Sequence, residues 1–227
     1  MIKRIDITGP IAEGMWQYGY PFPIVDVKAE KGYTEGFGDF AFTAVPGFHS
    51  LTGTYLETPA HFKGYSESFL IDSVPVEKLM DMNCVILNVD MDVNSSEKQR
   101  ITLDMLKASQ GAKEIKRGDA ILVGTGWGDE KWFSQDNFSM SPYFTKEAFD
   151  FLLAQEPSLI GSDTSCWDNL SNPSGLFNDF YERGILMLAE LRNLKKVPVS
   201  RVKLTVLPLL LGNSCASPCR AVVSYEE

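Results

Sequence analysis

Several short apolar runs limit the fold of this chain more than any other feature of its sequence. Each run holds only four to six residues, which is too short for an ordinary helix and typical of a strand. The first run, which ends at Val89, predicts a buried strand. The runs are Cys84–Val89, Ala120–Val123, Ser158–Gly161 and Ile185–Leu188.

The rest of the chain adds further strands and a smaller number of helices. Alternating or apolar patterns predict strands at Ile2–Thr8, Phe40–Val45, Val202–Leu207 and Arg220–Ser224. Caps and apolar spacing predict helices at Val74–Met80, Thr102–Lys107, Thr145–Leu153 and Asn178–Arg183. Because strands outnumber helices and several connections are long, we expect a mixed α/β domain built on sheets, with few helices, rather than a doubly wound βαβ repeat.

The segment from Gly9 to Gly38 is dominated by glycine and aromatic residues. We expect it to form loops packed over a surface. No internal repeat or low-complexity linker divides the sequence, so residues 1–227 are expected to form one domain.

The charge pattern argues against nucleic acid and anionic membranes as partners. The formal net charge is −9, and the lysines and arginines are scattered, so no basic stripe exists to neutralise phosphates. The longest late apolar run, Val206–Leu211, is far too short to span a bilayer, and no apolar stretch of signal-peptide length follows the first residues. We expect a cytoplasmic protein.

Three patterns resemble known sites but lack an essential part of each. The four cysteines have no C-x-x-C spacing, so we expect packed thiols rather than a zinc ribbon or a redox pair. The run Gly124–Gly128 follows a strand, but its spacing is G-x-G-x-G and no ordinary helix start follows, which argues against a dinucleotide site. The acidic run Asp90–Asn94 lacks the glycine and glutamate of a calcium loop, so we expect a surface turn.

The stretch from His49 to His61 is the strongest candidate for chemistry. Side chains two apart share one face of a strand, so Tyr55, Glu57 and His61 are expected to point the same way. Such a set forms a plausible acid–base group: His61 titrates near neutrality, Glu57 orients it, and Tyr55 donates a hydrogen bond to a carbonyl or a developing oxyanion.

The same stretch resembles the hallmark H-x-G-T-H-x-D-x-P-x-H of the cyclase family that includes bacterial kynurenine formamidase, a set of metal-dependent amide hydrolases. Leu51–His61 aligns with it without a gap and keeps Gly53, Thr54, Pro59 and His61. The resemblance extends along nearly the whole chain. Its other blocks are Asp6–Met15, Gly118–Trp127 and Ser217–Ala221.

The family binds zinc or manganese, and this sequence departs from its ligand pattern. The first two histidines and the aspartate of the hallmark are metal ligands in the family, and their places hold Leu51, Tyr55 and Glu57. A later histidine falls on Gly175 and a later glutamate falls on Ala189, with Glu190 one position late and expected to face the other way. We therefore expect no metal cofactor, because a catalytic zinc usually needs three protein ligands; if a metal binds, Glu57 and His61 are the ligands.

Further candidate residues follow from the same comparison. Cys166 stands where the family has a serine, and a thiol beside an imidazole is a candidate nucleophile; the alternative is a small buried filler. The loops contain aromatic residues suited to lining a pocket. Candidate binding residues are Trp16, Phe22, His49, Leu51, Trp127, Asp163 and Glu190.

The resemblance implies a kynurenine formamidase-like swivelling β/β/α fold and a homodimer or homotetramer. Three functions stay open at this point. The first is a hydrolase or cyclase of arylformamidase type, cleaving a C–N bond or acting on another small carbonyl compound by metal-independent acid–base chemistry. The second is a non-catalytic small-molecule-binding descendant, and the third is an ordinary metal-dependent amide hydrolase with unusual ligands.

Overall fold

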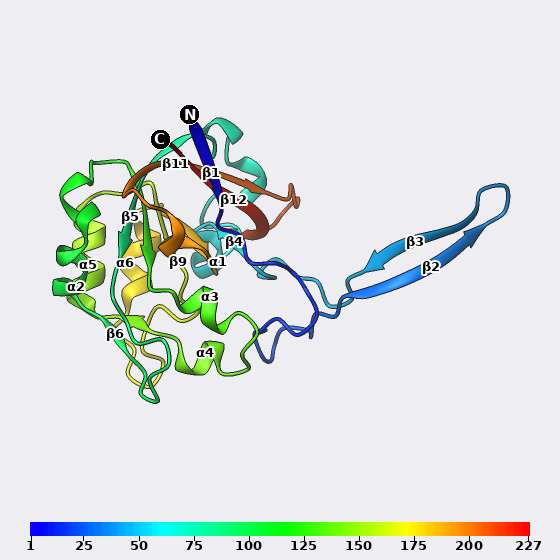
Figure 1. Cartoon of the computed structure of the whole chain (residues 1–227), viewed down its shortest axis with the longest axis horizontal. Helices are drawn as coiled ribbons and strands as arrows, with labels where there is room; N and C mark the ends of the chain where they lie inside the picture. The colour runs from blue at the N-terminus through cyan, green and yellow to red at the C-terminus, as the bar shows by residue number, and fades with distance from the viewer.

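One large sheet organises the chain in the computed structural model, which covers residues 1–227. Its strand order is β1-β12-β11-β5-β7-β9-β10-β4, and β12 also pairs with β4. This extra pairing closes the sheet into a barrel-like arrangement, with β1 attached outside the ring (Figure 1). The strands are β1 (Ile2–Asp6), β4 (Tyr55–Glu57), β5 (Met82–Asn88), β7 (Ala120–Gly124), β9 (Leu159–Ser162), β10 (Leu186–Ala189), β11 (Arg201–Pro208) and β12 (Ala216–Glu226).

Few helices accompany the sheet, and two of them begin at the predicted caps. The hydroxyl groups of Thr102 and Thr145 accept hydrogen bonds from the backbone of Met105 and Ala148, as N-caps do. The predicted helix at Val74–Met80 is instead a 3-10 turn, Val76–Lys78, and another 3-10 turn, Ile71–Ser73, lies just before the predicted segment. The helices are α1 (Ala60–Lys63), α2 (Leu103–Ala108), α3 (Trp127–Lys131), α4 (Asn137–Met140), α5 (Lys146–Ala154) and α6 (Leu176–Glu182).

The central strands are buried on both faces, which explains their short apolar runs. Alternate residues of β5 and β7 belong to two different clusters of buried side chains. One cluster includes residues of α2, α5 and α6 and covers the outer face of the sheet, while the other fills the inside of the closed sheet. The sheet therefore gives a rigid support to the residues at the ends of β4 and β10.

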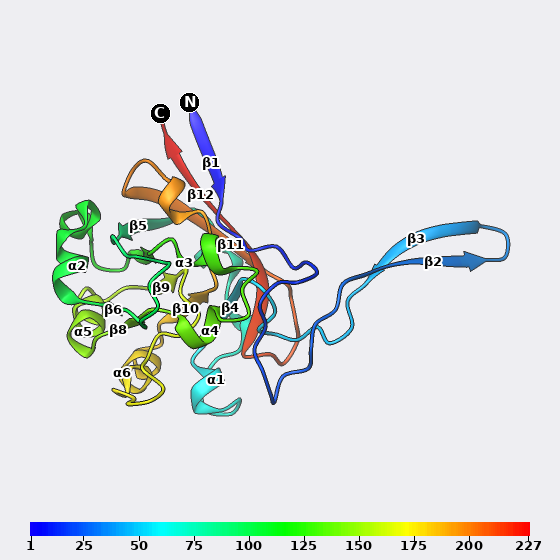
Figure 2. The ribbon, with the colours of Figure 1, turned by 60° about the horizontal axis from the view of Figure 1, so that its bottom comes forward.

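A long β-hairpin extends away from the rest of the chain and corrects the prediction of packed loops before Gly38. It consists of β2 (Lys28–Thr34) and β3 (Gly38–Ala44), paired antiparallel over their whole length. Figures 1 and 2 show it projecting from the body in both views. The missed strand β2 is polar on both faces, so no apolar alternation marks it in the sequence. We call residues 28–44 the arm.

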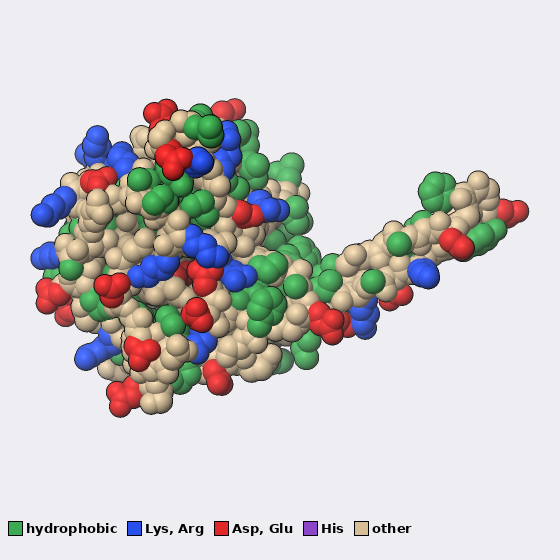
Figure 3. Space-filling view, viewed as in Figure 1, with side chains coloured by type: hydrophobic (Ala, Val, Ile, Leu, Met, Phe, Trp, Pro, Cys, Tyr) green, Lys and Arg blue, Asp and Glu red, His purple; other side chains and the backbone are tan.

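The observed elements confirm the predicted mixed α/β architecture with few helices. Two two-residue strands, β6 (Arg100–Ile101) and β8 (Tyr143–Phe144), form a separate parallel pair that the sequence did not predict. Lysine and arginine side chains are mixed with acidic ones over the face drawn in Figure 3. No helix combines the length and the apolar character that crossing a membrane requires.

Candidate functional site

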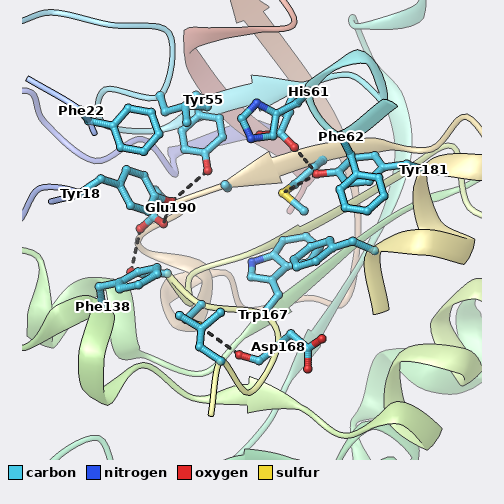
Figure 4. A pocket seen from close by; sticks show the side chains of 18 residues that line it. Tyr18, Phe22, Tyr55, His61, Phe62, Phe138, Trp167, Asp168, Tyr181 and Glu190 are labelled. Carbon is cyan, nitrogen blue, oxygen red and sulfur yellow. Dashed lines mark hydrogen bonds and ion pairs between the residues drawn. The ribbon is translucent and has the colours of Figure 1, made fainter. Parts of the chain in front are cut away.

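A cavity of about 330 Å³ lies beside the ends of β4 and β10 and is lined mainly by hydrophobic side chains (Figure 4). Helices α1 and α6 and the segment after β9 complete its wall. Its aromatic residues are Tyr18, Phe22, Tyr55, Phe62, Phe138, Trp167, Phe177 and Tyr181. Its other residues are Leu51, Glu57, His61, Ser165, Cys166, Asp168, Leu170, Met187, Ala189 and Glu190.

The structure brings Tyr55, Glu57 and His61 to this one cavity. On β4, Leu56 points into the inner cluster, so Tyr55 and Glu57 on either side of it face the cavity. The strand ends at Glu57, and Pro59 precedes the single turn of α1. That turn brings His61 back over the strand, with Nε2 3.8 Å from Oε2 of Glu57.

The surroundings of Glu57 and His61 change the acidity of both groups. Burial raises the pKa of Glu57 to about 7, although the hydroxyl of Tyr181 donates a hydrogen bond to Oε1 and opposes this change. Burial also lowers the pKa of His61. At slightly alkaline pH the imidazole is therefore neutral and the carboxyl is mostly ionised, which is the arrangement of a general base beside a neutral hydrogen-bonding group.

The thiol beside the imidazole is Cys215, which corrects the expectation for Cys166. Sγ of Cys215 lies 3.5 Å from Nδ1 of His61, and Cys215 is not among the residues that line the cavity. Cys166 does line the cavity, but its Sγ contacts Lys98 Nζ at 3.8 Å and the carbonyl oxygen of Asp168 at 3.1 Å. Burial raises the pKa of Cys166, so the thiolate that a nucleophile needs is disfavoured.

Glu190 points into the cavity, contrary to the expectation that it faces the other way. It follows the last residue of β10 and has a left-handed backbone conformation, with φ of 62°, so the alternation of a strand ends before it. Its side chain is only 2% exposed. Oε1 accepts a hydrogen bond from the Tyr18 hydroxyl at 3.2 Å, and Oε2 lies 2.9 Å from Oγ of Ser165.

Only some of the predicted pocket residues line the cavity. Phe22 and Leu51 do, whereas His49 stacks on the outer side of Phe22 and accepts a hydrogen bond from the backbone of Leu51. Trp16 packs edge-on behind Tyr18. Trp127 is buried among core residues, and its indole N–H donates to Asn137. Trp16 also stacks on Phe138, so it supports the wall without forming its surface, and Trp127 is not among the lining residues.

Asp163 lies outside the lining of the cavity and holds the backbone at the start of α3. Its carboxylate accepts hydrogen bonds from the backbone and hydroxyl of Thr125 and from the backbone of Gly126. Contrary to the sequence reading, a short helix, α3, does begin in the glycine-rich run. The backbone N–H groups before it are occupied by the carboxylate of Asp163, so no dinucleotide phosphate has access to them.

The side chains of this site do not fit the three-ligand metal centre that the family resemblance implies. No group of three or more histidine, cysteine, aspartate or glutamate side chains is arranged to hold a metal ion. Leu51 and Tyr55 stand in ligand places, and one oxygen of Glu57 already accepts a hydrogen bond from Tyr181. Glu57 and His61 are thus two donors where a catalytic zinc usually needs three.

Several residues of the site were missed by the sequence reading. Tyr18 lies in a segment predicted to be surface loops, and Tyr181 lies on the inner side of α6. Ser165 belongs to the polar run Ser162–Ser165 at the end of β9 and precedes the predicted Cys166. This polar run was the only signal in the sequence, since contacts between distant segments leave no trace in spacing.

Comparison with known proteins agrees with this fold. The sequence model of the Cyclase family, described as "Putative cyclase", matches residues 5–169. No curated protein matches the sequence. An isatin hydrolase bound to the product analogue thioisatinate is 20% identical, with a TM-score of 0.79 over 100% of this chain and 93% of that chain.

Two further solved structures have the same fold. Isatin hydrolase A from Ralstonia solanacearum is 20% identical, with a TM-score of 0.77 over 99% of this chain and 92% of its own. A protein described as a "predicted metal-dependent hydrolase from Bacillus stearothermophilus" is 22% identical, with a TM-score of 0.72 over 99% and 98%. These likenesses confirm the expected cyclase-like fold. Because the family match spans more than half of the sequence, this chain belongs to the Cyclase family.

Proposed function

We propose that this chain is a hydrolase or cyclase that acts on a small carbonyl compound by acid–base chemistry without a metal. One observation carries this proposal: Glu57 and His61 lie side by side on the wall of an aromatic cavity. The two groups differ in charge above neutral pH, because burial raises the pKa of the carboxyl and lowers the pKa of the imidazole. A carboxylate with a pKa near the working pH is well suited to be a general base.

For the hydrolysis of an amide, ionised Glu57 takes a proton from a water molecule, and the water oxygen attacks the carbonyl carbon. The π electrons of the carbonyl move onto its oxygen, which receives a hydrogen bond from the hydroxyl of Tyr55. When the carbonyl forms again, the C–N bond breaks and the leaving nitrogen takes the proton from Glu57. Neutral His61 holds the attacking water by its ring nitrogen and is not consumed.

The lining of the cavity supports a flat and uncharged substrate. Aromatic side chains make up much of the wall, and no lysine or arginine is among the lining residues. A substrate carboxylate therefore has no cation to bind, whereas an aromatic ring has several faces to stack on. Isatin, the substrate in the names of two structural relatives, is an uncharged aromatic cyclic amide and is the first compound to test.

The experiment is a turnover assay with isatin and related aromatic amides and esters, run with His61→Ala beside the unaltered chain. Loss of turnover in His61→Ala supports the proposal, and an unchanged rate contradicts it. A chelator added to a second sample separates this chemistry from that of a metal-dependent hydrolase, because metal-independent turnover survives it.

A second candidate is a protein that binds a small molecule without converting it. The observation that favours it is that polar groups of the cavity already bond to one another, Tyr181 to Glu57 and Tyr18 to Glu190. A metabolite that co-purifies and raises the melting temperature, with no turnover of any compound tested, supports this alternative.

We also propose that the chain works in the cytoplasm as a homodimer or homotetramer. Four free cysteines suit a reducing compartment. The arm supports the oligomer, because a two-stranded hairpin is marginally stable alone in water and this one carries four exposed aromatic side chains. They are Tyr33, Phe37, Phe40 and Phe42.

The oligomer is tested by size-exclusion chromatography with light scattering. The full chain is expected at two or four times its monomer mass. A variant with residues 28–44 replaced by a short Gly-Ser linker is expected to become monomeric, and a monomeric full chain contradicts the proposal.

A further inference from the structure

Glu190 is a buried carboxyl group without a counter-ion. Its side chain is 2% exposed, and none of the ion pairs of the chain includes it. A carboxylate in such a place loses its hydration and gains no compensating positive charge. The neutral acid is therefore the form that the surroundings favour.

The hydrogen bonds that link Glu190 to Ser165 and Asn137 also require a proton on Glu190. Oγ of Ser165 contacts both Oδ1 of Asn137 and Oε2 of Glu190, but the hydroxyl has one proton. The amide orientation of Asn137 is fixed, because its Nδ2 donates to the carbonyl of Lys131 and its Oδ1 accepts from Trp127. Oδ1 only accepts, so the Ser165 proton goes to Asn137, and the contact at 2.9 Å with Glu190 needs a proton on Oε2.

The hydrogen bonds on the other side of Glu190 lead to two phenols of the cavity. The Tyr18 hydroxyl donates to Oε1 at 3.2 Å, which uses its only proton. The Tyr55 hydroxyl lies 3.0 Å from that of Tyr18 and must be the donor between the two. Figure 4 shows Tyr18, Tyr55 and Glu190 converging on one side of the cavity. When Tyr55 turns its proton to a ligand, Tyr18 keeps its own bond to Glu190.

We propose that Glu190 is a protonated carboxylic acid in the folded protein at neutral pH, and that it positions Tyr18 and Tyr55 so that the Tyr55 hydroxyl receives the carbonyl oxygen of a substrate. The second part rests on the proposed function, and the first part does not. Glu190 is a positioning residue in this account, since it acts through the phenols.

The neutral state of Glu190 has a direct effect on catalysis. A negative charge that develops on a substrate oxygen near Tyr55 is not repelled by a neutral acid, whereas a carboxylate would repel it. Burial raises the pKa of Glu190 well above its ordinary value; the hydrogen bond from Tyr18 opposes this rise, and nearby Asp163 adds to it. The raised pKa of Glu190 agrees with the proton that the hydrogen bonds around Ser165 require, and the two arguments are independent.

The protonation of Glu190 is tested by infrared spectroscopy, which needs no substrate. The test uses a Glu57→Gln chain, because Glu57, with its pKa raised to about 7, is itself partly protonated near neutral pH. At pH 7.5 this chain is expected to show the C=O stretch of a protonated carboxylic acid, and the double variant Glu57→Gln/Glu190→Gln is expected to lack it. Absence of this band from the Glu57→Gln chain, or its persistence in the double variant, overturns the first part. Glu190→Gln keeps one acceptor toward Tyr18 and one donor toward Ser165, so failure of this variant to fold also counts against the proposal.

The positioning role is tested by rescue with the conservative variant on any substrate found. Glu190→Ala is expected to lower kcat by at least about tenfold, because Tyr18 and Tyr55 lose their anchor. Glu190→Gln is expected to recover most of that loss, because an amide presents the same donor and acceptor. Equal losses in both variants overturn the positioning role. A chain with the infrared band and no turnover in any form contradicts the proposed function and leaves the assignment of the proton standing.

Discussion

Oε2 of Glu57 lies 3.8 Å from Nε2 of His61, across the point where β4 ends and the single turn of α1 begins. The contact depends on Pro59, which precedes α1, because the chain turns there and brings His61 back over Glu57. It places a carboxyl group with a raised pKa beside an imidazole with a lowered pKa on the wall of the cavity.

Replacing His61 by alanine is expected to lower kcat/KM by about 100-fold or more, as the loss of a group from an acid–base pair does. His49→Ala is the matched control, because this second histidine stacks outside Phe22 and does not line the cavity. Steady-state kinetics of both variants check the prediction. Equal losses in the two variants, with both still folded, are incompatible with a specific role for His61.

The rate is expected to rise with pH through a midpoint of about 7. Only ionised Glu57 accepts a proton from water, and burial raises the pKa of this carboxyl to about 7. The measurement is the pH profile of kcat/KM from pH 5.5 to 8.5. Glu57→Gln should remove both the rising limb and the activity, whereas a profile without any inflection near neutrality would rule out Glu57 as the base.

The folded protein is expected to lose stability as the pH rises from about 4.5 to 7. Glu57 has a folded pKa of about 7 against an ordinary value of 4.5, so over this range the folded state holds a proton that the unfolded state has released. The free energy of unfolding is expected to fall by roughly 3 kcal/mol over this range and to stay at the lower value above it. Denaturant titrations at pH 5 and pH 8 check it.

Glu57→Gln supplies the comparison for that experiment, because it cannot ionise in either state. Its stability should depend less steeply on pH than that of the unaltered chain. Parallel pH dependences for the two chains would mean that the pKa of Glu57 is not raised in the folded state.

Asp163→Ala is expected to destabilise the fold by about 2–4 kcal/mol, because it leaves buried donors of Thr125 and Gly126 without an acceptor. The exposed Glu13 gives the control, with Glu13→Ala expected to stay within about 0.5 kcal/mol. Thermal unfolding of both variants measures the difference. A stable Asp163→Ala chain with lost ligand binding would return Asp163 to the set of binding residues.

The sequence predicted the central strands well, because burial on both faces leaves continuous apolar runs such as Cys84–Leu87 and Ala120–Val123. It did not predict β2, whose residues are exposed on both faces and therefore carry no pattern. Its partner β3, equally exposed, was predicted at Phe40–Val45, because Phe40 and Phe42 alternate with smaller residues there.

The candidate site was predictable in part. Tyr55 and Glu57 share one face because a strand alternates, and that rule needs no tertiary structure. Glu190 was misplaced because one left-handed residue ends the alternation. Cys215 was overlooked as the thiol next to His61, because the two residues are 154 positions apart in the sequence and meet only in the fold.

The central claim is that the acid–base chemistry of this chain needs no metal. The most direct measurement is turnover of isatin, or of another aromatic amide identified in the assay, before and after treatment with a chelator, with metal content measured on the same samples. The account predicts far less than one metal ion per chain and an unchanged rate. A rate that falls with the chelator, returns with zinc or manganese and follows the metal content would contradict it.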